Sequence, residues 1–353
     1  MLRVKILLFA AVLIVTPMSI KSQSFEETLG NLSTIAAKKY IEPAMTAFGS
    51  NLNSGWVNQV PGQTILGFDL NIKIVGMGTF LNDKAKTFAT AGVFRFNSSQ
   101  ADDILANSGI TSAHPAYAGA KQELLSKEWN VNFSGPTIIG KDTDRLKINF
   151  PGGTVSGVTL NPYVETVNDV KGLLNEMPIL PTGAPQITVG TLMGTQVMVR
   201  YLPSIEIDKL GKMTFSGFGI IHNPGAWLNN PLPVDLGIGF FTQSLKIGSI
   251  VESTATQYGI FVSKTIGAII SIVPYAGFTI ESSKTTVNYD FEYSTVVNGT
   301  TVNPKDKINF EIEGENSSSF VVGATIKLAV VNLNVDYKMA KYNTLSAGVS
   351  FGF

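Results

Sequence analysis

The last eleven residues of the chain alternate between apolar side chains and small or polar ones. Read with a period of two, one face carries Leu345, Ala347, Val349, Phe351 and Phe353, and the other carries Thr344, Ser346, Gly348, Ser350 and Gly352. Successive side chains of a β-strand point to opposite sides of a sheet. The C-terminal segment is therefore predicted to be a strand with one apolar and one polar face.

The same two-residue period recurs along the chain and is clearest in residues 68–74, 234–240, 320–328 and 331–338. The polar side of these and other predicted strands carries charges and amides, which are costly in a dry core but tolerated in a wet lumen. The pattern predicts an all-β fold, a transmembrane antiparallel β-barrel. The candidate lumen-facing residues are Asp69, Lys73, Arg200, Asp235, Lys327, Asn332, Asn334 and Asp336.

The composition is consistent with a membrane barrel. Charged residues make up 15% of the chain and hydrophobic residues 44%, yet no apolar run after residue 22 approaches the ~20 residues of a spanning helix. Only helices and closed sheets satisfy every backbone polar group in lipid. The chain has no cysteine and only two histidines, His114 and His222, far apart in sequence, so we expect no disulfide, metal centre or cofactor. Its near-neutral charge predicts no nucleic-acid partner.

The N-terminus predicts export. Arg3 and Lys5 precede an apolar run over residues 6–15, which is too short to span a bilayer as a helix. Small and polar residues follow it. We predict a signal peptide over residues 1–22.

An amphipathic helix is expected over residues 23–46. Ser24 and Glu27 form a capping box, and Pro43 is expected to end the helix. The helix either seals the periplasmic end or fills the lumen, or it acts as a gate. The candidate gate or plug residues are Phe25, Leu29, Leu32 and Tyr40.

The barrel is expected to occupy residues 47–353 and to contain about twelve strands, with ten or fourteen as alternatives. Residues 66–77 and 86–96 are predicted to form one hairpin. A less regular inserted region is expected over 97–194, with helices near 99–106 and 168–175. Because the apolar positions change from even to odd along the strand 268–293, a bulge or bend is predicted at residues 282–284.

The terminal strand, with Val349, Phe351 and Phe353, resembles the last strand of bacterial outer-membrane barrels. In that family this strand is the signal read by the barrel-insertion machinery. The resemblance implies that the chain resides in the outer membrane of a Gram-negative bacterium, with outer-membrane lipid and the insertion machinery as partners.

Further segments, rich in glycine and aromatic residues, carry a second resemblance. Residues 48–56 and 66–70, together with 219–223, 227–228 and 232–236, are similar to an uncharacterised family of exported barrels from Bacteroidota-type bacteria. At a greater distance, a helix followed by a mid-sized barrel is similar to the outer-membrane transporters of fatty acids and aromatic hydrocarbons.

Three functions remain open on the sequence. The favoured one is gated or narrow passage of a small or hydrophobic solute, because a helix precedes a barrel with a polar inner face. The second is a structural or adhesive surface barrel, suggested by a long hairpin over 268–328 with Tyr289, Phe291 and Tyr293. The third is a barrel hydrolase using Ser216 and His222. The spacing of these two residues matches no established triad order, so we expect no enzyme and no catalytic residues.

Overall fold

The computed structural model describes residues 33–207, 211–292, 295–297, 300–302 and 305–352. The predicted signal peptide, the helix residues Phe25, Leu29 and Leu32, and the C-terminal Phe353 lie outside these residues. The side chains of Tyr289, Phe291 and Tyr293 also lie outside the described part.

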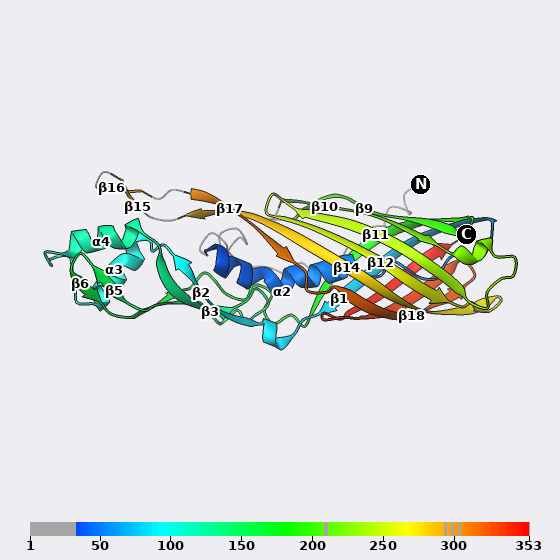
Figure 1. Cartoon of the computed structure of the whole chain (residues 1–353), viewed down its shortest axis with the longest axis horizontal. Coiled ribbons are helices and arrows are strands. Elements are labelled where there is room, and N and C mark those ends of the chain that lie inside the picture. The colour runs from blue at the N-terminus through cyan, green and yellow to red at the C-terminus, as the bar shows by residue number, and fades with distance from the viewer. Residues whose placement is uncertain (1–32, 208–210, 293–294, 298–299, 303–304, 353) are drawn as a thin grey trace, which may run out of the picture.

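The described residues form a closed antiparallel barrel of ten strands at one end of an elongated molecule (Figure 1). Strand β12 pairs with β14 and thereby closes the sheet. In the order in which they occur along the chain, the barrel strands are β1 (Leu66–Phe80), β8 (Ile179–Leu192), β9 (Thr195–Ile207), β10 (Gly211–His222), β11 (Asp235–Ile247), β12 (Val251–Ser263), β14 (Ile270–Glu292), β18 (Ser318–Leu328), β19 (Val331–Met339) and β20 (Thr344–Gly352).

The barrel therefore has ten strands, one of the alternatives to the expected twelve. Two further strands belong to the same sheet without closing it, β13 (Ile266–Gly267) and β17 (Lys305–Glu313). Beyond β14 and β17 lies a small hairpin of β15 (Thr295–Val297) and β16 (Thr300–Val302). A single 3-10 turn, η2 (Pro224–Trp227), lies between β10 and β11.

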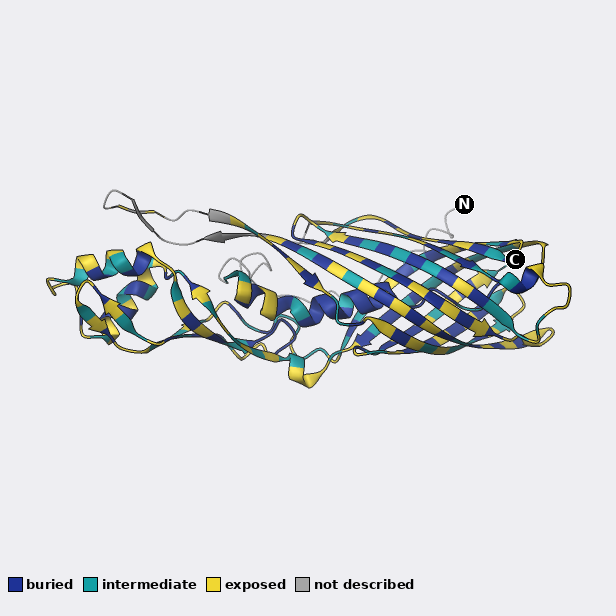
Figure 2. Cartoon of the chain, viewed as in Figure 1, coloured by how far each residue is buried: buried dark blue, intermediate teal, exposed yellow. Residues whose placement is uncertain are grey.

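The outer surface of the barrel is apolar and its inner surface is polar. Along β14, for example, Ile272, Phe278 and Ile280 are exposed, whereas Ser271 and Thr279 are buried. Figure 2 shows this alternation as buried and exposed bands on the barrel strands. An apolar exterior around a closed sheet is the arrangement that lipid requires. Among the described residues, no helix combines the length and hydropathy needed to cross a bilayer.

Residues 81–178, which we call the head, form a separate unit between β1 and β8 (Figure 1). The head has a four-stranded sheet in the order β2-β3-β4-β7 and a two-stranded sheet of β5 and β6. Its elements are η1 (Asp83–Ala85), β2 (Thr87–Phe94), α3 (Ser98–Asn107), α4 (Tyr117–Ser126), β3 (Trp129–Pro136), β4 (Leu146–Phe150), β5 (Gly153–Val155), β6 (Val158–Leu160) and β7 (Tyr163–Val167).

The limits of the head correct two predictions. Residues 86–96 do not form a hairpin with β1, because β2 pairs with β3, while β1 pairs with β8 and β20. The inserted region is thus 81–178 rather than 97–194, and residues 179–192 belong to the barrel. The helix expected at 99–106 is α3, but residues 168–175 form turns instead of a helix.

Helix α2 (Thr34–Leu52) runs from the head into the barrel, and most of its residues are buried (Figures 1 and 2). Pro43 lies inside the helix, so the prediction that it ends the helix is wrong. A proline removes one backbone hydrogen bond from a helix. Burial on both sides of Pro43 outweighs that loss: Tyr40 and Ile41 pack in the head core, and Leu52 packs between barrel strands.

The predicted bulge at residues 282–284 is absent from the described pairing of β14 with β12, whose register is continuous from Val251↔Val287 to Ser263↔Tyr275. The apolar residues of β14 move from outward-facing to inward-facing positions because the inside of the sheet becomes apolar at this height. Val287 points inward and joins Phe310, Ile312 and α2 residues in one apolar cluster. On its other edge β14 changes partner at this point, from β18 to β17. The register there shifts by one residue between Ile280↔Ser318 and Lys284↔Glu313, so the irregularity expected at 282–284 lies on this edge.

Candidate functional site

Residues 50–60, which we call the plug segment, continue from the end of α2 into the barrel lumen. The last carbonyl groups of a helix have no partner within the helix. Here the Ser50 carbonyl accepts hydrogen bonds from Lys338 Nζ at 2.8 Å and from Ser54 Oγ at 2.6 Å, and the Leu52 carbonyl accepts one from Trp56 Nε1 at 3.1 Å. A cation at this position also interacts favourably with the negative end of the helix dipole.

Two more buried cations bind carbonyl groups farther along the plug segment. Lys73 Nζ donates to the Gly55 carbonyl at 2.8 Å and also to Asn58 Oδ1. Arg200 donates to the Ser54 carbonyl at 3.0 Å. Both cations are fully buried, so the barrel wall holds this segment through charge-assisted hydrogen bonds in a site shielded from water.

Arg200 is the best-connected of these cations. Besides Ser54, it donates to Gln186 Oε1 at 2.9 Å and to Gln243 Oε1 at 3.0 Å. Its guanidinium lies 3.8 Å from the centre of the Trp56 ring, which in turn packs 5.3 Å from Phe241. The arrangement fixes Trp56 near the middle of the lumen through cation–π and aromatic contacts.

All ten barrel strands contact the plug segment. The contacts of β1, β9 and β19 are those of Lys73, Arg200 and Lys338, and Phe241 of β11 packs on Trp56. Polar contacts from five other strands are Gln186 (β8) to the Trp56 carbonyl at 3.0 Å, Ser263 (β12) with Val60 N at 3.1 Å, Ser282 (β14) with Asn53 at 3.1 Å, Thr325 (β18) to the Asn58 carbonyl at 2.7 Å, and Thr344 (β20) with Ser50 at 2.8 Å.

The tenth strand, β10, contacts the plug segment through glycine. A Cβ atom at Gly217 or Gly219 would lie 3.0 or 3.2 Å from the Trp56 ring. On β11, a Cβ atom at Gly237 would lie 2.8 Å from Val60. These glycines leave room for the large side chains of the plug segment. The segment therefore makes contact all around the inner wall of the barrel, at successive heights in the lumen.

Further buried charges surround the plug segment. Lys338 pairs with Glu281 at 3.1 Å, and both side chains are 1% exposed. Tyr275 donates to Asp336 at 3.1 Å and accepts from Asn334 at 3.0 Å, and Asn334 also contacts Thr325 at 3.1 Å. This chain of hydrogen bonds reaches the plug segment at Asn58, so the lumen is braced by one connected polar network.

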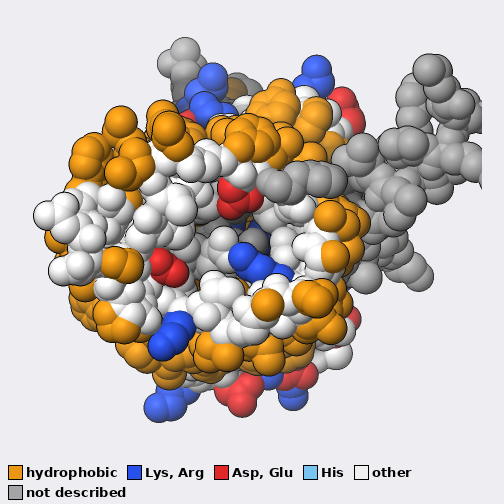
Figure 3. All heavy atoms as spheres, turned by 90° about the vertical axis from the view of Figure 1, so that its right-hand side faces the viewer, with side chains coloured by type: hydrophobic (Ala, Val, Ile, Leu, Met, Phe, Trp, Pro, Cys, Tyr) orange, Lys and Arg blue, Asp and Glu red, His pale blue; other side chains and the backbone are white. Residues whose placement is uncertain are grey.

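A cavity of about 320 Å³ lies between the plug segment and the end of the barrel that holds the β18–β19 turn and Gly352, which we call the turn end. Figure 3 looks onto this end and shows a hollow with charged side chains at its mouth, ringed by hydrophobic ones. Trp56 lines this cavity and also a second one of about 20 Å³, which lies by Asp336 and Lys338. Trp56 thus separates the two spaces.

The structure places the predicted lumen residues in two groups. Lys73, Arg200, Asn334 and Asp336 are buried around the plug segment. Asp69, Lys327 and Asn332 line the larger cavity, and Asp235 accepts from Gln63 and Asn223 near the turn end. Of the insertion-signal residues, Val349 and Phe351 are exposed on the outer face. Tyr40 lies in the head core rather than the lumen, where it donates to the Lys171 carbonyl at 2.7 Å.

The sequence analysis missed several residues of this network. Lys338 and Glu281 form its buried ion pair, and Gln186 and Gln243 position Arg200. Lys338 lies on the polar side of an alternating strand, so the two-residue pattern could have identified it. The glutamines gave no comparable signal, because their role depends on pairing between distant strands.

Outside the barrel strands, burial raises the pKa of two tyrosine side chains. Burial in the head core raises the pKa of Tyr40 well above its usual value. Burial, together with the nearby Glu315 carboxylate, raises the pKa of Tyr342 to about 12. Both phenols are therefore neutral hydrogen-bonding groups at physiological pH.

Ser216 and His222 lie on the same outward face of β10, six residues apart, which is ~20 Å along a strand. His222 interacts instead with Thr195 Oγ1 at 2.9 Å and Trp227 Nε1 at 3.2 Å. Within the described part of the chain, acidic and histidine side chains form no group arranged to hold a metal ion.

Comparison with protein families adds one finding. The whole chain, residues 1–353, matches the model of a family of unknown function (DUF6588). The chain belongs to this family. No curated protein matches the chain. The resemblances to Bacteroidota-type barrels and to fatty-acid or hydrocarbon transporters stay predictions.

Several solved structures of outer-membrane barrels are similar to this chain at low sequence identity. The outer-membrane protease OmpT of Escherichia coli is 11% identical, with a TM-score of 0.23 over 82% of this chain and 100% of that chain. The attachment invasion locus protein Ail of Yersinia pestis is 11% identical, with a TM-score of 0.20 over 45% and 93%. The transport unit of the autotransporter AIDA-I of Escherichia coli is 7% identical, with a TM-score of 0.26 over 88% and 98%. The barrel assignment rests on the strand pairing of the chain itself.

Proposed function

We propose that this DUF6588 protein is an outer-membrane anchor whose sealed barrel holds the head on the cell surface. The observation that carries the proposal is the plug segment, which contacts nine barrel strands through hydrogen bonds or aromatic packing and β10 through glycines beside Trp56. A barrel filled in this way serves as a rigid base better than as an open pore.

The lengths of the connections support one orientation of the barrel. Outer-membrane barrels have short periplasmic turns and longer extracellular loops. The turn end carries the two-residue connections β8–β9 and β18–β19, the twelve-residue connection 223–234 and the last residues of β20. The opposite end carries the much longer head and the β14–β17 extension. This asymmetry supports a head outside the cell and a turn end facing the periplasm.

Helix α2 supports a mechanical role because it belongs to both parts. Ala37, Tyr40 and Ile41 are buried in the apolar core shared with the head, and Leu52 and the plug segment are buried in the lumen. A helix of this length extends ~28 Å. One continuous rod therefore ties the head to the barrel, and the head is held in a fixed orientation.

Gated passage of a small solute is the second candidate. It is favoured by the cavity of about 320 Å³ behind Trp56, because a solute could dwell there before the plug segment moves. Movement would break the hydrogen bonds of three buried cations at once, each worth ~1.5–3 kcal/mol. For this reason the sealed form is the proposed resting state.

Surface display predicts that trypsin added to intact cells cleaves the head. The exposed loop 141–144 offers Lys141 as a cleavage site. We expect the full-length band to convert to fragments joined only by the barrel, visible by immunoblot after denaturation. As the control, Lys141→Gln should slow cleavage in this loop. Cleavage that begins only after the outer membrane is permeabilised would reverse the orientation and reject the proposal.

A further inference from the structure

The cavity at the turn end has the composition of a binding site for a small polar molecule. Its volume of about 320 Å³ lies within the usual range of ligand sites, ~300–1,000 Å³, at the lower end. Ten of its fifteen lining residues are polar, and six of those ten carry amide side chains. The lining comes from six barrel strands and from the plug segment, so its shape is set by the closed barrel.

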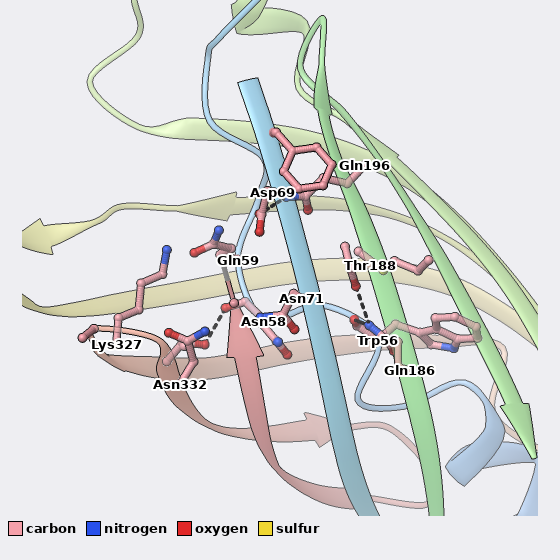
Figure 4. A pocket seen from close by; sticks show the side chains of 15 residues that line it. Trp56, Asn58, Gln59, Asp69, Asn71, Gln186, Thr188, Gln196, Lys327 and Asn332 are labelled. Carbon is pink, nitrogen blue, oxygen red and sulfur yellow. Dashed lines mark hydrogen bonds between the residues drawn. The ribbon is translucent and has the colours of Figure 1, made fainter. Parts of the chain in front are cut away.

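The polar groups converge on one space. In Figure 4, Lys327 and Asn332 lie on one side of the cavity and Thr188 and Gln196 on the other, with Asp69, Asn71 and Gln59 between them. Asp69 accepts a hydrogen bond from Gln196 at 2.9 Å, and Asn71 donates to Ser350 at 3.1 Å. One N–H donor of each of these two amides is thus used by the protein.

Two acceptors in the wall are buried without a hydrogen-bond partner, Gln59 Oε1 and Asn71 Oδ1. A buried polar atom that lacks a partner costs ~1–3 kcal/mol. Both belong to residues that line the cavity. As the side chains lie, both oxygens are closed off from the cavity. If either amide turns toward the cavity, a molecule that supplies a hydrogen-bond donor would remove that cost, and this requirement limits its chemistry.

We propose that the cavity binds a small neutral molecule rich in hydroxyl groups, of the size of a monosaccharide. Each hydroxyl can donate to a free amide oxygen and accept from a threonine hydroxyl. The single acid and the single lysine in the lining balance each other, which disfavours an anion or a cation. Asp69 already accepts a hydrogen bond from Gln196, so the ammonium group of a zwitterion would have to compete with Gln196 for this carboxylate.

This site is independent of the display role, because it faces the turn end and uses neither the head nor α2. It can therefore bind its ligand whether the plug segment is static or movable. Failure of the trypsin experiment would leave the binding site standing, and failure of the binding experiment would leave the display role standing.

The test is isothermal titration of the full chain in detergent micelles with D-glucose, D-galactose and D-mannose, and with L-alanine as a zwitterionic probe. At least one sugar is expected to give a saturable signal and to bind more tightly than alanine. Asn71→Leu and Gln59→Leu should each weaken that binding by about 5-fold, the equivalent of one hydrogen bond. Asn309→Leu, which changes an exposed amide of β17 outside the cavity, should bind as the unsubstituted protein does.

Gln59→Leu keeps the test informative if Asn71→Leu fails to fold, because the Gln59 oxygen makes no hydrogen bond in the fold. The proposal is overturned if none of the three sugars gives a saturable signal, or if alanine binds more tightly than all of them. It is also overturned if sugar binding is unchanged in the folded cavity variants, since the site would then lie elsewhere.

Discussion

Replacing Arg200 with methionine is expected to lower the free energy of unfolding by about 3–5 kcal/mol, one of the largest effects of any single change in this chain. Methionine has a similar length but no hydrogen-bond donor. The Ser54 carbonyl, Gln186 Oε1 and Gln243 Oε1 would each lose a donor inside the lumen. Urea titration of the protein folded in lipid vesicles, followed by tryptophan fluorescence, measures the change.

Two variants make the Arg200 experiment specific. Arg200→Lys keeps the charge but cannot reach three acceptors in a planar arrangement, so an intermediate loss is expected. Lys246→Met removes a half-exposed cation that pairs with Glu252 on the surface, which should cost at most ~1 kcal/mol. Equal stability of Arg200→Met and Lys246→Met would show that Arg200 does not hold the plug segment.

Replacing Trp56 with alanine is expected to destabilise the barrel by about 3–5 kcal/mol and to let ions pass. The Trp56 side chain is 2% exposed and separates the cavity of about 320 Å³ from the smaller one by Asp336 and Lys338. Its removal joins the two spaces and takes away the ring on which Arg200 stacks. Planar-bilayer recordings should show brief conductance steps for Trp56→Ala and none for the unsubstituted protein.

Trp227→Ala is the matched control, because Trp227 is 61% exposed at the turn end and lies outside the lumen. It should leave the recordings silent. Steady conductance steps from the unsubstituted protein would instead favour the passage of solutes, the second candidate function. Silence of Trp56→Ala together with unchanged stability would mean that Trp56 does not close the lumen.

The sequence predicted the barrel wall well because the signal for it is local. A period of two indicates which side chains face lipid and which face the lumen. It can be read in each strand from β9 to β20 without knowing which strands pair with it. The same pattern located Lys73, Arg200 and Asp336 on the polar side before any partner was known. Lys338 lies on the same polar face, so the pattern applies to it equally, whereas its contact with the Ser50 carbonyl depends on residues far apart in sequence.

What the sequence could not supply depends on contacts between distant residues. Residues 86–96 alternate as well as any barrel strand, but β2 pairs with β3 in the head. Pro43 is a local signal for the end of a helix, and burial in the head core and the lumen overrides it. Val287 is apolar yet faces the inside of the sheet. It does so because α2, rather than water, lies inside the sheet at that height.

The most direct test of the sealed lumen is a cross-link between the plug segment and the barrel wall. The chain has no cysteine, so Ser50→Cys and Thr344→Cys introduce the only two thiols. The Ser50 and Thr344 hydroxyl oxygens lie 2.8 Å apart, within reach of a disulfide. Mild oxidation of native outer membranes should join nearly all of the double variant, with a changed mobility on denaturing gels that is reversed by reductant. Thiols that stay free and react fully with a water-soluble maleimide would contradict a plug segment seated in the lumen.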